Sequence, residues 1–161
     1  MIIRSIFLQR GLFAVDNINL YTIGFTKKNA ETFFSLLKHN NVKRVIDVRL
    51  NNVSQLAGFT KQDDLKFFLK ELCNVDYHHF EQLAPTEDIL KRYKKNEIFW
   101  DQYVIEFNSL INQRKIETLV SLDLLKDSCL LCSEPTAEKC HRRLVAEYYA
   151  KIYPQISIIH L

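Results

Sequence analysis

The segment SCLLCSEPTAEKCHRRLVAEYYAKIYPQISIIHL, residues 128–161, contains the pattern that decides the fold. Its first part, SCLLCS, is a short apolar run, which is typical of a buried strand. The next part, residues 136–153, places apolar side chains at helical spacing on one face: Cys140, Leu144, Val145, Tyr148 and Ile152. The last part, QISIIHL, is rich in β-branched residues and predicts a second strand. A strand, a helix and a strand in this order predict a βαβ unit with parallel strands.

The rest of the chain repeats this alternation. Strands are predicted at residues 20–26, 42–49 and 75–80, and helices at 28–41, 61–73, 86–96, 97–113 and 115–125. We therefore expect an α/β fold, with a single domain over residues 1–161 and a mostly parallel sheet of about five strands with helices on both faces. Residues 1–18 are apolar but interrupted by arginines, and we expect an N-terminal extension or an extra strand there, not a signal peptide.

The composition of the 161 residues narrows the class of protein. The chain is 47% hydrophobic and 25% charged, which is ordinary for a soluble domain. No apolar run has the roughly 18 residues of a membrane span, so no membrane partner is expected. The four cysteines are too few for a disulfide framework, which predicts a reduced, cytoplasmic protein. Neither a dinucleotide fingerprint nor a P-loop can be written with the three glycines, and the net charge of +3 permits nucleic acid as a partner without requiring it.

Polar side chains gather after the predicted strands. In doubly wound sheets, ligands bind outside the carboxyl ends of the strands, where the strand order reverses. Side chains that could bind a ligand or take part in catalysis occupy these positions. They are Asp47 and Arg49, His78 and His79, Cys132, Ser133 and Glu134, and Cys140, His141 and Arg142 at the start of the next helix. We therefore expect a site at this edge of the sheet.

These residues also carry a family resemblance. The segments YTIGFT (21–26), VIDVRLNNVS (45–54) and CLLCSEPTAEKCHRRLVAEYY (129–149), with a closing ISIIH, follow one another in the order that resembles the domain of unknown function 488 family. The resemblance covers nearly the whole chain from about residue 20. It implies a small α/β domain with a mainly parallel sheet, and it implies no particular activity.

An anion site is the first hypothesis for the predicted edge. Arg49 follows an apolar strand, so its guanidinium is expected at the edge with Glu134 as its partner. That pair either ties two loops together or lines a pocket. In the pocket, Arg49, Arg142 and the free N–H groups of a helix start at Thr136 bind the anion, while Glu134 and His141 do acid–base chemistry. Arg142 is expected off the apolar stripe of its helix, so Arg142→Ala should leave the fold intact.

Four further residues are assigned supporting roles: Asp47, Ser54, Cys132 and Cys140. Cys129 and Cys132 cannot share a metal ion, because residues three apart in a strand point to opposite faces. Cys132 resembles a phosphatase nucleophile by position, but Glu138 stands where that mechanism needs an arginine. A zinc set of Cys132, Cys140 and a histidine (His78, His79 or His141) stays open. The sequence assigns no metal and no cofactor.

Three functions remain open at this point. The first is an enzyme acting on a phosphorylated, nucleotide or nucleic-acid substrate, and the second is a non-catalytic module that binds such a ligand. The third is a metal-dependent hydrolase with Asp47 and Glu134 as ligands. The basic run KRYKK (91–95), with Tyr93 inside it, predicts either a solvated helix face or a contact with phosphate groups. Catalytic activity and oligomeric state are not decided by the sequence.

Overall fold

The computed structural model describes residues 17–161, so the predicted extension at residues 1–18 lies outside the described residues except at its end, where Ile18 begins the first strand. All strand pairs are parallel, and the sheet order is β3-β2-β4-β1-β5. The strands are β1 (Ile18–Gly24), β2 (Arg44–Asp47), β3 (Asp76–His79), β4 (Ser128–Cys132) and β5 (Ile156–His160). The predicted α/β fold with a parallel five-stranded sheet is confirmed.

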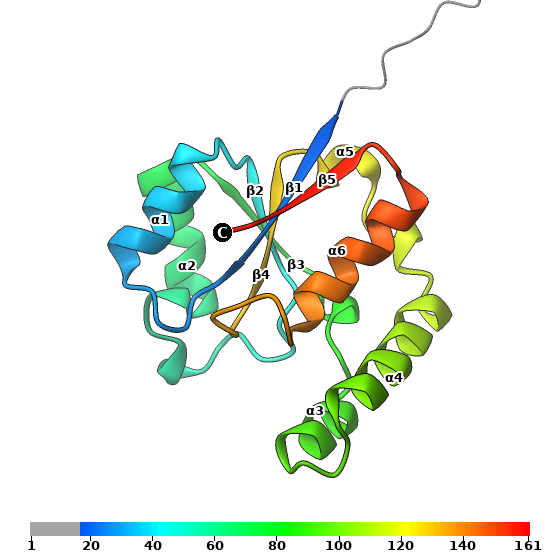
Figure 1. Ribbon diagram of the computed structural model, residues 1–161. Coiled ribbons are helices and arrows are strands. Elements are labelled where there is room, and N and C mark those ends of the chain that lie inside the picture. Colours follow the sequence, from blue (N-terminus) through cyan, green and yellow to red (C-terminus); the bar gives the residue numbers. More distant parts are fainter. Residues whose placement is uncertain (1–16) are drawn as a thin grey trace, which may run out of the picture.

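Helices cover both faces of this sheet (Figure 1). One face carries α1 (Ala30–His39) and α2 (Gln62–Phe68), which continues as a π-helical turn over Leu69–Cys73. The other face carries α4 (Trp100–Gln113) and α6 (His141–Ile152), and α3 (Glu87–Lys94) packs against α4 away from the sheet. Short 3-10 turns lie at Gln55–Thr60, Glu81–Leu83 and Ile116–Thr118. No helix among the described residues is long and apolar enough to cross a membrane.

The position of β4 creates the crevice in which a ligand is expected. β4 lies between β2 and β1, and the chain leaves those two strands toward α2 and α1 on one face. The chain leaves β4 toward α6 on the opposite face. Loops that diverge to opposite faces leave a gap at the carboxyl ends of the strands, which is where open α/β sheets bind ligands.

Strand β4 alternates between the two cores. Leu130 and Cys132 belong to the cluster under α4 and α6, whereas Cys129 and Leu131 belong to the cluster under α1 and α2. The prediction that Cys129 and Cys132 point to opposite faces is therefore confirmed, and both are free thiols.

Two helix predictions need correction. Residues 115–125 do not form one helix, because a 3-10 turn at Ile116–Thr118 is followed by the short α5 (Leu122–Leu125), which Ser121 caps. Helix α6 begins at His141 and not at Thr136, since Cys140 has an extended backbone (φ −133°, ψ 136°). Ile152, predicted to face inward, is 40% exposed, whereas Val145 and Tyr149 on the same helix are fully buried.

Candidate functional site

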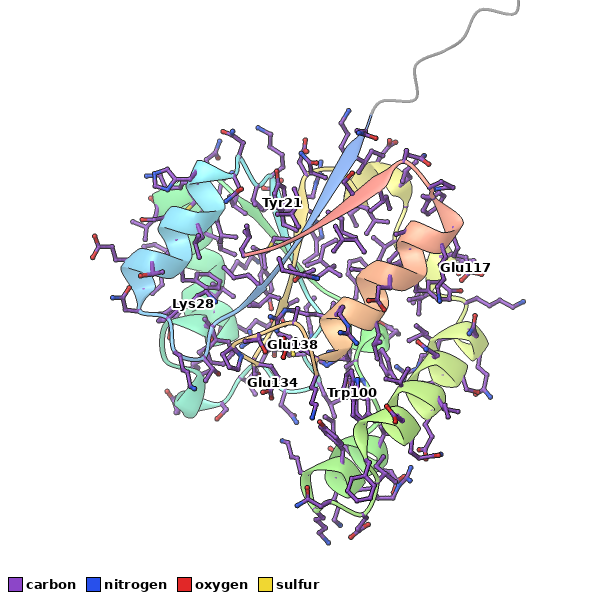
Figure 2. All side chains as sticks on the ribbon, viewed as in Figure 1. Tyr21, Lys28, Trp100, Glu117, Glu134 and Glu138 are labelled. Atoms are coloured by element: carbon purple, nitrogen blue, oxygen red, sulfur yellow. The ribbon has the colours of Figure 1, made fainter. Side chains whose placement is uncertain are left out.

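A cavity of about 490 Å³ lies at the carboxyl ends of β2 and β4. Three of the predicted site residues, Arg49, Glu134 and His141, line this one cavity. Figure 2 shows Glu134 on the loop after β4 and Trp100 at the start of α4, and both line the cavity. Its volume falls in the range of about 300–1,000 Å³ that is usual for small-molecule sites.

Arg49 has a different partner from the one the sequence suggested. Its guanidinium makes a two-point ion pair with Asp47, with Nε donating to Oδ1 at 2.8 Å and Nη2 donating to Oδ2 at 2.7 Å. Nη2 also donates to the backbone carbonyl of Thr60 at 2.8 Å, and Nη1 donates to the Thr60 hydroxyl at 3.3 Å. The predicted Arg49–Glu134 pair is wrong. With its charge matched and its side chain only 3% exposed, Arg49 forms part of the cavity wall.

The Asp47 carboxylate is fully buried and satisfied. In addition to Arg49, it accepts hydrogen bonds from the Tyr77 hydroxyl at 2.7 Å and from the Asn52 amide at 3.3 Å. Burial, together with the charge of Asp47, raises the pKa of Tyr77, so the phenol keeps its proton. Both oxygens of Asp47 accept hydrogen bonds, and Asp47 belongs to no group of potential metal ligands among the described residues, so the structure does not support the hypothesis of an Asp47–Glu134 metal site.

Arg142 is a buried structural cation. It is 1% exposed and does not line the cavity. Its Nη1 donates to the backbone carbonyl of Glu134 at 2.7 Å, and its Nε donates to the Thr22 hydroxyl at 3.4 Å. The expectation that Arg142 lies off the packed face and holds an anion is wrong, because the guanidinium is used to fasten the loop after β4.

Thr136 and Ser54, two other predicted residues, also lie outside the cavity lining. Thr136 is exposed in the loop before α6, so the free N–H groups of a helix start are not there. Ser54 is exposed, and its carbonyl accepts the N–H of Ala57 at 3.0 Å. Its place is in the loop between β2 and α2.

Gly24 allows the loop after β4 to approach β1. A Cβ atom at this position would lie 1.7 Å from the carbonyl oxygen of Glu134 and 3.1 Å from Nη1 of Arg142. Backbone atoms therefore occupy the space that any side chain would need.

We expect Gly24→Ala to lower the free energy of unfolding by about 1–3 kcal/mol, as overpacking does elsewhere, because the Glu134 carbonyl must move away from Arg142. Urea denaturation followed by circular dichroism measures this change. An unchanged midpoint would show that the Glu134 carbonyl does not pack against Gly24.

Cys132, Cys140 and His141 form a compact cluster at the cavity wall. One ligand-type atom from each residue lies within 4.8 Å of the others, and all three residues line the cavity although each is buried. A hydrogen bond from the Cys140 thiol, with the N–H groups of Glu134 and Ser133, lowers the pKa of Cys132 against the opposing effect of burial. The same contact raises the pKa of Cys140.

The orientation of His141 follows from its two nitrogen contacts. Nε2 lies 2.7 Å from the backbone carbonyl of Val48, which can only accept, so Nε2 carries the hydrogen. Nδ1 faces the Cys132 sulfur at 3.7 Å. The predicted acid–base role for His141 would therefore have to act through Cys132, since each ring nitrogen already faces a protein atom.

Another part of the cavity lining is aromatic. Trp100 and Tyr103 stack with ring centroids 5.1 Å apart and planes at 16°, and Tyr93 lies 4.9 Å from Tyr103. Lys94 and Lys139 also line the cavity. Sequence reasoning noticed Tyr93 and Lys94 in the basic run but assigned Trp100 and Tyr103 to the core, because their spacing is that of an apolar helical stripe.

The fold and the site together define the class of protein. It is a parallel α/β domain with a cavity at the switch in strand order, and thiols, an imidazole and aromatic rings line that cavity. Residues 29–149 match the family described as "Domain of unknown function DUF488", and the chain belongs to this family. No curated protein and no solved structure matches the chain.

Proposed function

We propose that the chain is an enzyme that binds a planar, negatively charged substrate of the nucleotide class in the cavity at the carboxyl ends of β2 and β4. The observation that supports this most strongly is that one cavity combines two kinds of lining residue. Aromatic rings and lysines line it together with a thiol–imidazole cluster and a carboxylate.

The aromatic side chains of the cavity lining suit a flat ring system. Trp100 is half-buried, and its stacked partner Tyr103 is only 2% exposed, so the pair is held rigidly. Phe99, which is 79% exposed, stands at the rim of the cavity. Stacking of a base on an aromatic side chain contributes about 1–3 kcal/mol and tolerates any base.

The charges around the cavity favour an anion. Lys94 and Lys139 are exposed, and neither has an ion-pair partner among residues 17–161. Arg49 is neutralised by Asp47, which leaves Glu134 as the single acidic residue of the lining. Two unmatched ammonium groups against one carboxylate give the cavity a net positive field that suits one or two phosphate groups.

The thiol–imidazole cluster favours an enzyme over a binding module. A binding surface for nucleic acid needs an open row of free cations. In α3, however, Arg92 is engaged by Asp88 and by Glu106, which neutralises one of the four positive charges of the basic run at residues 91–95. A buried thiol–imidazole cluster with an exposed carboxylate beside it supplies groups that a purely electrostatic binder does not use.

Trp100 is the only tryptophan of the chain, and its fluorescence therefore reports directly on this cavity. We expect AMP to quench it in a saturable manner and adenosine to bind about tenfold more weakly, because a lost phosphate contact corresponds to about 1.4 kcal/mol. Lys94→Ala and Lys139→Ala should each weaken AMP binding by a similar factor.

Lys66→Ala is the matched control, since Lys66 is an exposed lysine on α2 and does not line the cavity. Its affinity for AMP should equal that of the unaltered protein. The proposal is contradicted if AMP leaves the Trp100 signal unchanged at millimolar concentration, or if Lys66→Ala weakens binding as much as the two cavity variants.

A further inference from the structure

We infer that Cys132, Cys140 and His141 form a zinc site whose fourth coordination position opens into the cavity. Thiolate and imidazole groups are the ligands that zinc prefers in proteins, and magnesium and calcium take oxygen ligands instead. Two cysteines and one histidine with the fourth position free are a known arrangement of catalytic zinc.

The distances agree with a site that needs little adjustment. Zinc–sulfur and zinc–nitrogen bonds of about 2.3 and 2.0 Å in a tetrahedron place a sulfur and a nitrogen ligand about 3.5 Å apart. The Cys132 sulfur and His141 Nδ1 lie 3.7 Å apart, and all three ligand atoms lie within 4.8 Å of one another. A metal ion at the centre of the three atoms would replace the hydrogen bonds that now join them.

The surroundings orient the histidine ligand. His141 donates Nε2–H to the Val48 carbonyl at 2.7 Å, which directs Nδ1 toward the Cys132 sulfur at 3.7 Å. Histidines that bind metals usually donate their other nitrogen to such an acceptor.

Charge balance explains how the site tolerates burial. Cys132 is 5% exposed and Cys140 is 1% exposed, so two free thiolates there would be strongly unfavourable. Two thiolates and a Zn²⁺ ion together carry no net charge, and the imidazole is neutral. The metal therefore allows both thiols to lose their protons inside the core.

The free coordination position links the zinc site to the proposed function. This link, unlike the metal site itself, rests on the proposed function. All three ligands line the cavity, and the exposed carboxylate of Glu134 lines it as well. Zinc lowers the pKa of a bound water to about 7, and a carboxylate beside it can accept the proton. Arg142 holds the backbone of the loop at Glu134, since its Nη1 donates to the Glu134 carbonyl at 2.7 Å.

The test is the zinc content of the untagged protein, measured by mass spectrometry after reconstitution in reducing buffer and removal of loose metal. We expect about one zinc ion per chain. Cys132→Ser and Cys140→Ser should each lower retention of zinc by more than tenfold. Cys73→Ser is the matched control, because Cys73 is a free cysteine on the π-helical turn outside the cluster, and it should retain the metal.

A second measurement covers variants that fail to fold. Unaltered protein loaded with Co²⁺ should show the thiolate-to-metal charge-transfer band and the intense visible bands of a tetrahedral site. Protein that binds neither zinc nor cobalt, or that binds them equally well after Cys132→Ser, would overturn the inference. So would a Cys132–Cys140 disulfide that persists in reducing buffer.

The two proposals fail separately. Zinc is measured without any nucleotide, and Lys94→Ala should retain the metal while losing affinity for AMP. Zinc binding without AMP binding would leave the metal site in place and remove the substrate class.

Discussion

Asp47→Ala is expected to lower the free energy of unfolding by about 3–5 kcal/mol, because it leaves the Arg49 guanidinium buried without a counter-charge. Asp47 is 0% exposed and Arg49 is 3% exposed, so water cannot replace the lost carboxylate. The change also removes the acceptor of the Tyr77 hydroxyl and of the Asn52 amide. Urea denaturation followed by circular dichroism measures this change in the free energy of unfolding.

Glu97→Ala is the control for this first prediction. Glu97 also faces a cation, but its pair with Lys95 has an oxygen–nitrogen distance of 3.8 Å and both side chains are more than half exposed. Exposed pairs contribute about 0–1 kcal/mol, so the control should remain close to the unaltered protein. Equal losses for the two variants would show that the Asp47–Arg49 pair is hydrated and not part of the core.

Arg142→Ala is expected to cost about 3 kcal/mol or more. Part of the loss, about 1.5–3 kcal/mol, is the charge-assisted hydrogen bond to the Glu134 carbonyl. The remainder comes from the cavity left by the largest fully buried side chain of the described core. The loop after β4 loses its anchor at the same time, so AMP binding and zinc retention should fall as well.

Lys151→Ala is the matched change for comparison with Arg142→Ala. Lys151 lies in the last turn of the same helix, is exposed, and has no ion pair among the described residues. Its replacement should change stability by no more than about 0.5 kcal/mol. If Arg142→Ala proved equally mild, the guanidinium would not be the anchor of the loop.

The fold could be predicted because alternation of short apolar runs with helical stripes leaves few choices. β4 and α6 follow from residues 128–153 alone, and the opposite faces of Cys129 and Cys132 follow from the two-residue period of a strand. The same alternation placed Arg49, Glu134 and His141 after strands, and the structure brings these three to one cavity.

The partners of the two arginines could not be predicted in the same way. Arg49 and Asp47 are two apart at a strand end, and the backbone bends there so that the Asp47 carboxylate also accepts the Arg49 N–H at 3.1 Å. Side chains two apart in a regular strand point to the same face without meeting in a two-point pair, so the strand pattern does not predict this partner. The partner of Arg142 is a backbone carbonyl, a group that every residue carries, so no residue type marks it in the sequence.

The start of α6 shows a further limit. Thr136 looks like a capping residue, yet the helix begins five residues later, and its N-cap, Cys140, makes no side-chain capping bond. The loop between is fixed by Arg142 from the helix side and by the contact with Gly24 from the strand side. Local preference is overruled here by tertiary contacts, and the result is that Cys140 and His141 face Cys132.

The most direct measurement is a crystal structure of zinc-loaded protein soaked with AMP, with data collected on both sides of the zinc absorption edge. We predict an anomalous peak bonded to the sulfurs of Cys132 and Cys140 and to Nδ1 of His141, and an adenine ring lying against Trp100. AMP bound away from the β2–β4 cavity, together with no zinc peak at these three residues, would contradict the account.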